Sequence, residues 1–156
     1  MPSTLLGLPA HPLVVHAVVV LVPLACVMAI ASAASPRFRQ WARWATPAVA
    51  VLAALAVPVA TSTGEGLERG VPHSSLVEQH AQLGDTLLPL MGAVALFVLV
   101  LTFLHRRGAK GAVVVAVSLL VGLASVGTLV QVVRIGHSGA TAVWHGTKVP
   151  AAGEHD

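Results

Sequence analysis

Residues 13–34 read LVVHAVVVLVPLACVMAIASAA, a run of apolar and small side chains without one Lys, Arg, Asp or Glu. A helix needs about 20 such residues to cross the ~30 Å hydrocarbon core of a bilayer. Three more runs of this kind follow, at residues 44–61, 87–104 and 112–133. Barrel strands would instead alternate in polarity over many short segments. The sequence therefore predicts an all-α membrane protein, a bundle of four transmembrane helices.

The composition of the 156 residues indicates the same class. Hydrophobic residues make up 56% of the chain and charged residues 10%, whereas an ordinary soluble domain has about 25% charged residues. These numbers exclude a soluble fold and a disordered chain, and a single Cys excludes a disulfide scaffold. We expect one membrane domain over residues 1–150, with spans at about 13–34, 44–61, 76–105 and 112–135, and a tail at 151–156.

The charged residues predict the orientation of the bundle. Six of the nine basic residues lie in the loops that follow the first and third spans, namely Arg37, Arg39, Arg43, Arg106, Arg107 and Lys110. All six acidic residues lie between the second and third spans or in the C-terminal tail. Short loops rich in Lys and Arg stay in the cytoplasm, so we expect both termini to be extracytoplasmic. The high isoelectric point then reflects topology, and nucleic acid is not expected as a partner.

The third helix is predicted to be longer than its membrane span. Ser75 and Glu78 fit a capping box, and nothing forces the helix to stop before residue 105, although Pro89 can kink it. About 30 residues at 1.5 Å each give roughly 45 Å, so about two turns should stand outside the bilayer. Residues 62–74, with three Gly and one Pro, are expected to form a loop.

Histidine is the distinctive residue of this chain. On the predicted topology, seven of the eight histidines lie at or beyond the extracytoplasmic face. His16 lies about one turn inside the first span and His80 on the protruding part of the third helix, and ionisable residues in such places are functional candidates. Gly84, on the same helix face as His80, leaves room for a flat ligand. Arg134, at the end of the fourth helix, suits a propionate or another carboxylate.

These residue types match a bis-histidine site for haem b. In this hypothesis His16 and His80 hold the iron from opposite faces, Gly84 lines the slot and Arg134 faces the propionates. Three alternatives stay open. A Cu or Zn ion would add His11 or His137 to His16 and His80 as ligands. The cluster could instead titrate as a proton relay, or it could only anchor helices and bind no cofactor. No residue spacing identifies an enzyme.

Several motifs of the chain occur together in one known family. The segment GLPAHPLVVH at residues 7–16, the Thr63-Gly64 step, the segment HAQL at residues 80–83 and the glycine-rich segment at residues 136–146 resemble a bacterial four-helix membrane family, domain-of-unknown-function family 2231. The chain differs from the family directly after the first motif, where Ala17 and Val18 replace the usual aromatic residue and proline. In the last motif, Ala140 replaces a usual Gly and Trp144 a usual Tyr.

The resemblance implies a multi-pass protein of the bacterial inner membrane without an assigned reaction. Some relatives are joined to a Rieske-type iron–sulfur domain, which associates the family with electron transfer, although this chain lacks the ligands of such a domain. Two functions are therefore carried forward. One is electron transfer through haem to a redox partner, and the other is a non-catalytic accessory role beside other membrane subunits, with Cu, Zn or no cofactor. Membrane lipid is expected to surround the bundle in both cases.

Overall fold

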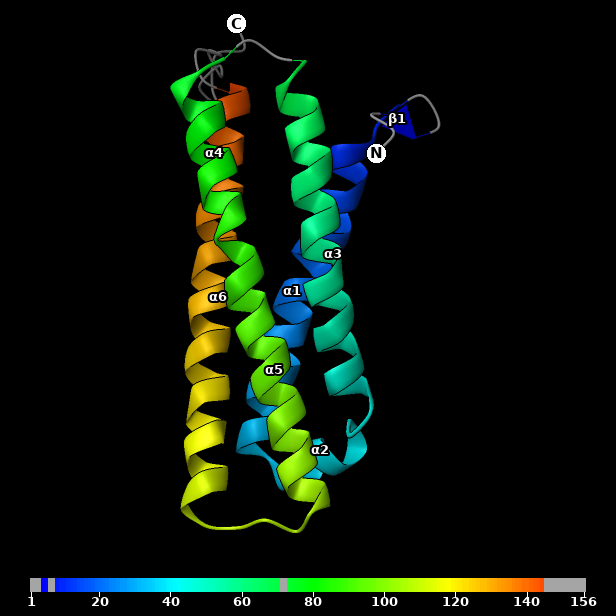
Figure 1. The fold of residues 1–156 in the computed structure, drawn as a ribbon, viewed down its shortest axis with the longest axis vertical. Helices are drawn as coiled ribbons and strands as arrows, with labels where there is room; N and C mark the ends of the chain where they lie inside the picture. Colours follow the sequence, from blue (N-terminus) through cyan, green and yellow to red (C-terminus); the bar gives the residue numbers. More distant parts are fainter. Residues whose placement is uncertain (1–3, 6–7, 71–72, 145–156) are drawn as a thin grey trace, which may run out of the picture.

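The computed structural model describes residues 4–5, 8–70 and 73–144, and within them four long apolar stretches of helix run side by side (Figure 1). These are α1 (Ala10–Ala34), α3 (Ala45–Glu68), α4 (Ser75–Asp85) continued by α5 (Leu87–Arg106), and α6 (Ala112–Trp144). The short helix α2 (Pro36–Trp41) joins α1 to α3, and a small hairpin of β1 (Thr4–Leu5) and β2 (Leu8–Pro9) precedes α1. Each long stretch is apolar and long enough to span a membrane, which confirms the predicted fold class.

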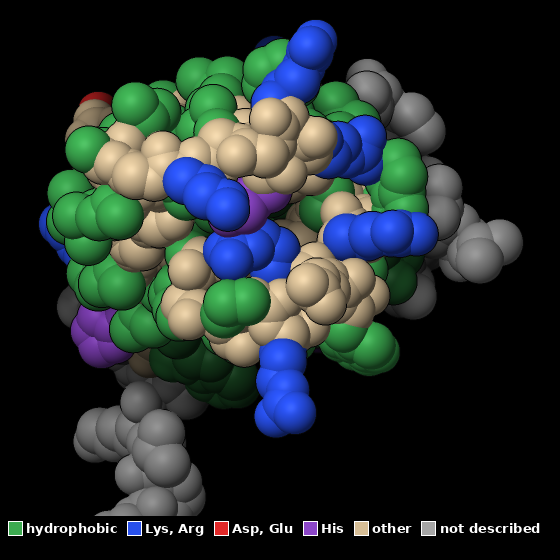
Figure 2. Space-filling model, turned by 90° about the horizontal axis from the view of Figure 1, so that it is seen from below, with side chains coloured by type: hydrophobic (Ala, Val, Ile, Leu, Met, Phe, Trp, Pro, Cys, Tyr) green, Lys and Arg blue, Asp and Glu red, His purple; other side chains and the backbone are tan. Residues whose placement is uncertain are grey.

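The helices pair within the bundle. α1 packs on α3 and α6, α5 packs on α3 and α6, and α4 packs mainly on α6. One end of the bundle holds α2 and the turn between α5 and α6. We call it the basic end, because the six basic residues listed above lie there; Figure 2 shows Lys and Arg side chains gathered over it. The opposite end carries His11, His80 and His137, and we call it the histidine end.

Small side chains allow the helices to approach closely, as is common in membrane bundles. Ala25 and Ala29 of α1 are fully buried, and so are Ala50 and Ala53 of α3. Large apolar side chains cover the outside instead. On α6, Leu119 is 69% exposed, Leu123 73% and Val133 70%. A bundle with a small-residue interior and an apolar exterior fits a lipid environment.

Two helices extend further than the sequence predicted. α3 continues through the expected loop to Glu68, and α6 continues past residue 135 to Trp144. The glycines of residues 62–74 predicted a loop, because glycine disfavours a helix interior, and the prediction for the fourth span ended at residue 135. Gly64 in α3 and Gly139 in α6 give space to side chains from neighbouring helices, so tertiary packing overrides local propensity here.

The third span was predicted as one continuous helix, and this prediction was wrong at one residue. α4 ends at Asp85 and α5 begins at Leu87, with Thr86 between them. Pro89 explains the place, since it has no N–H for the carbonyl of Asp85 and its ring crowds that carbonyl. The buried Gln131 of α6 covers the interruption by donating from Nε2 to Thr86 Oγ1 (2.6 Å) and to the carbonyl of Leu83 (3.1 Å).

The start of the third span also differs from the prediction by one residue. Ser74, not Ser75, is the N-cap of α4, and its Oγ accepts a hydrogen bond from the backbone N–H of Val77 at 3.2 Å. Ser75 is the first helical residue. Either serine could cap the helix from sequence alone, because both precede the same apolar run.

Candidate functional site

His11 is held by α3 at the histidine end. Its ring is half-buried, and Nδ1 lies 3.2 Å from the carbonyl oxygen of Ala60 and 3.3 Å from Oγ1 of Thr63. The ring packs flat enough against α3 that a Cβ added at Gly64 would lie 3.0 Å from His11 Cε1. A glycine is therefore needed at position 64 for this close approach.

His80 is held by α6 in the same way. Its ring is half-buried, and Nδ1 lies 3.0 Å from Oγ of Ser138. A Cβ added at Gly139 would lie 2.9 Å from His80 Cε1. Each imidazole thus rests on a hydroxyl–glycine step of the helix beside it, Thr63-Gly64 for His11 and Ser138-Gly139 for His80. We call these two arrangements the histidine–glycine units.

The hydrogen bonds determine which nitrogen carries the proton in each neutral ring. A carbonyl only accepts, so His11 Nδ1–H donates to Ala60. The Ser138 hydroxyl donates its own hydrogen to the carbonyl of Ile135 at 2.9 Å, so it accepts from His80 Nδ1–H. Nε2 is then the unprotonated nitrogen in both rings, with a lone pair available. Metal-ligating histidines are oriented in this manner, with the other ring nitrogen donating to a carbonyl or another oxygen.

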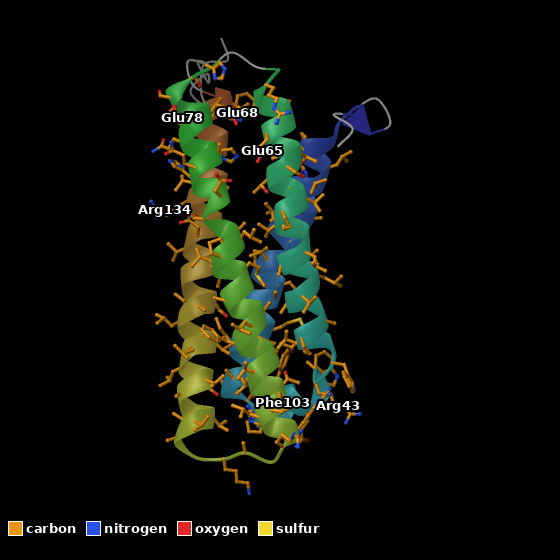
Figure 3. The ribbon with its side chains drawn as sticks, in the orientation of Figure 1. Arg43, Glu65, Glu68, Glu78, Phe103 and Arg134 are labelled. Carbon is orange, nitrogen blue, oxygen red and sulfur yellow. The ribbon has the colours of Figure 1, made fainter. Side chains whose placement is uncertain are left out.

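The two units lie at the same end of the bundle, although they belong to different helix pairs (Figure 1). Figure 3 shows the surroundings of this end, where Glu65 and Glu68 of α3 and Glu78 of α4 project. Glu68 is half-buried and lies one helical turn beyond Gly64. Carboxylates therefore surround the site more densely than cations do.

His16, which the sequence paired with His80, is placed differently from His11. Its side chain is exposed, and its Nδ1 bonds to the carbonyl of Pro12 in its own helix. The buried face of α1 includes Val18, Val22 and Ala25. His11 lies seven residues before Val18, two helical turns along the same face, whereas His16 lies off that face. His11 is bonded to α3, whereas no hydrogen bond joins His16 to another helix among the described residues.

The other residues proposed from sequence are also placed by the structure. Gly84 is half-buried, and outside its own stretch of helix no described atom lies within 4 Å of a Cβ added there. Arg134 is exposed, donates from Nη1 to Gln131 Oε1 at 3.4 Å, and lies on the side of α6 away from α3 (Figure 3). His137 is exposed beside Ser138.

A metal site with three or more protein ligands is not formed by the described residues, since no three His, Cys, Asp or Glu side chains there converge. His145 and His155 lie outside the described residues. The histidines that the structure ties to a neighbouring helix are His11 and His80.

The sequence analysis named Thr63-Gly64 and residues 136–146 as motifs, but it missed that these segments, together with Ala60, support the imidazoles. A signal was present, because each hydroxyl–glycine step follows its histidine at a similar spacing. The separation is 52 positions from His11 to Thr63 and 58 from His80 to Ser138.

Comparison with known proteins agrees with this architecture. A family model described as "Predicted membrane protein (DUF2231)" matches residues 7–149. No curated protein and no solved structure matches the chain. The matched range includes both histidine–glycine units.

Proposed function

Since the chain belongs to the DUF2231 family of predicted membrane proteins, we propose that it is a membrane electron carrier whose histidine end binds one haem b between His11 and His80. The observation that carries the proposal is the pair of equivalent histidine–glycine units, each of which leaves Nε2 unprotonated. Two imidazoles match the ligand number of a bis-histidine haem, whereas structural Zn takes four ligands. This proposal replaces His16 with His11 as the partner of His80.

The protein's own residues would orient and tune the ligands. Ala60, Thr63 and Ser138 accept the Nδ1 protons and fix the ring orientations, and Gly64 and Gly139 allow each ring to lie against its helix. Haem with two histidine ligands passes single electrons and has no open position for a substrate. The function proposed is therefore electron transfer without a reaction on a bound substrate.

We place the histidine end outside the cytoplasm of a bacterial inner membrane, because the basic end carries the Lys and Arg residues that stay inside. At the histidine end the described charged residues are Arg69 and Arg134 against four carboxylates, Glu65, Glu68, Glu78 and Asp85. An acidic end favours a redox partner with a basic face. The partner would therefore dock from the extracytoplasmic side.

The test is the absorption spectrum of protein purified from haem-replete cells. We expect a Soret band, and after reduction with dithionite a sharp α band in the green part of the spectrum. His11→Ala and His80→Ala should each remove these bands. His16→Ala and His137→Ala are matched controls, because each removes an exposed histidine close to one unit; both should keep the bands.

Two results would count against the proposal. A colourless protein from haem-replete cells would leave the non-catalytic accessory role as the better interpretation. If His16→Ala removed the bands while His11→Ala kept them, the ligand would be His16, as the sequence alone suggested.

A further inference from the structure

A second feature lies at the opposite, basic end of the bundle, and it does not depend on the proposed haem. A cavity of about 460 Å³ opens there between the end of α1, α2, the start of α3 and the end of α5. Arg39, Arg43 and Arg106 line it together with His105, and no acidic residue does. Three arginines around one cavity without a carboxylate form a site for an anion.

The polar side chains of this cavity are held in place by the fold. Arg39 is half-buried and donates from Nη1 to the carbonyl of Ser32 at 2.9 Å. A guanidinium has five N–H donors, so this anchor uses only part of its capacity. Arg106 lies over the ring of Trp44, with its Cζ 4.0 Å from the ring centroid, which is a cation–π contact. Trp44 thereby positions the guanidinium at the rim.

An apolar groove of about 620 Å³ continues from this cavity along α3 and α5. The two hollows share Trp44, Pro47, Thr102 and Arg106 as lining residues. The groove then passes between apolar side chains of the membrane span, including Leu52, which is 56% exposed, and Leu99, which is 45% exposed. Figure 3 places Phe103, which also lines the groove, at the same end of the bundle as Arg43.

We propose that these two hollows together bind one anionic glycerophospholipid, with its phosphate among Arg39, Arg43 and Arg106 and an acyl chain along the groove. The cavity lined by arginines fits a charged headgroup, and the apolar groove that adjoins it fits an acyl chain. Basic pockets between membrane helices are known places of anionic headgroup recognition. A free anion would occupy the cavity but not the groove. A zwitterionic lipid would occupy the groove, but the three arginines would raise its affinity less.

The experiment compares phosphatidylglycerol, phosphatidylcholine and glycerol 3-phosphate, each added to the purified protein in detergent. Bound lipid is counted by native mass spectrometry, and the thermal unfolding midpoint is followed in parallel. Each arginine near an anionic lipid raises the affinity on the order of fivefold. We therefore expect phosphatidylglycerol to bind at least about tenfold more tightly than phosphatidylcholine. Glycerol 3-phosphate should raise the midpoint little.

Two double variants distinguish lipid binding in the cavity from attraction of the lipid to basic residues elsewhere on the surface. Arg39→Gln with Arg106→Gln should lower the affinity for phosphatidylglycerol by about 25-fold, on the same basis. Arg37→Gln with Lys110→Gln removes the same charge from exposed residues that do not line either hollow, and it should change the affinity less than twofold. Equal losses in the two variants would show diffuse attraction to the surface and overturn the proposal.

A measurement on the wild-type chain covers the case in which the first variant fails to fold. Because Trp44 lines both hollows, brominated phosphatidylglycerol should quench tryptophan fluorescence more than brominated phosphatidylcholine at equal mole fraction. Equal quenching by the two lipids would overturn the proposal. So would a rise of the unfolding midpoint with glycerol 3-phosphate as large as that with the whole lipid, because it would identify a free-anion site.

Discussion

At the scale of single residues, the two glycines of the histidine–glycine units show how a small side chain determines the position of a large one. Gly64 and Gly139 lie inside helices, where glycine costs about 0.5–1 kcal/mol relative to alanine. Any side chain there would meet His11 or His80. The two glycines therefore destabilise their helices slightly, but they leave the space that the rings of His11 and His80 occupy.

Gly139→Ala is expected to displace His80. The new Cβ would lie 2.9 Å from Cε1 and 3.2 Å from Nδ1 of the ring, so the ring must move and its bond to Ser138 is lost. Overpacking of this kind costs about 1–3 kcal/mol, measured as the free energy of unfolding in detergent. Gly136→Ala is the control, since nothing lies within 4 Å of its added Cβ; it should be neutral or slightly stabilising. An equal effect of both substitutions would contradict the close contact.

Ser74→Ala is expected to destabilise the start of α4, and Ser75→Ala is not. The Ser74 side chain accepts the backbone N–H of Val77, and loss of an N-cap costs about 1 kcal/mol. Ser75 already lies within the helix, where alanine is favoured. Hydrogen exchange at the first turn of α4 would distinguish the two variants. If exchange were faster in Ser75→Ala alone, Ser75 would be the N-cap, as the sequence suggested.

From the sequence, His80 was paired with His16 as a haem ligand, and His11 was offered only as a further ligand for a metal ion. His80 was identified because its helix stands beyond the membrane span. His16 was preferred over His11 because of its depth along the helix, but rotation about the helix axis decides which side chain meets α3. The heptad spacing from His11 to Val18 contained that information. Thr63-Gly64 and residues 136–146 stood out as motifs, but their role as supports could not be predicted, since it depends on which helices are neighbours.

At the scale of helices, the interruption at Thr86 shows how a neighbouring helix supports a break in a membrane span. Without water, an unpaired backbone group inside a bilayer is costly. Gln131 of α6 donates to Thr86 Oγ1 and to the carbonyl of Leu83, and it thereby ties the junction to another helix. Pro89 marked the place in the sequence, whereas the partner on α6 could only be seen in the assembled bundle.

Gln131→Leu is expected to destabilise the junction of α4 and α5. It keeps the approximate size of the side chain but removes two hydrogen bonds, at a cost on the order of 1–2 kcal/mol. The thermal unfolding midpoint in detergent should fall. Val130→Leu, a change at a neighbouring side chain that is 55% exposed, should leave the midpoint unchanged. An unchanged midpoint in Gln131→Leu would mean that the junction is satisfied without α6.

At the scale of the whole molecule, the number and type of spans were predictable because each span must be apolar along about 20 residues. Helix ends beyond the span were not, because outside the bilayer the same residues can form a loop or a helix. The ends of α3 and α6 were helical since both carry a histidine–glycine unit.

The orientation of the bundle remains a prediction from charge. A reporter fused after Asp156 should be active only outside the cytoplasm, and one inserted at the exposed Gly108 only inside. Alkaline phosphatase and green fluorescent protein, which are active on opposite sides, measure this directly. A fluorescent cytoplasmic fusion at the C-terminus would reverse the orientation and place the histidine end inside.

The pairing of helices has a consequence for ancestry. Each histidine–glycine unit is complete within one half of the chain, His11 with α3 in the first and His80 with α6 in the second. A gene encoding a single hairpin, paired with its own copy about a two-fold axis, would already present two identical imidazoles to each other. A planar macrocycle has two like faces, so such a dimer would suit it before any fusion or duplication. The two halves, expressed as separate fragments divided near residue 72, should therefore recognise each other in the membrane.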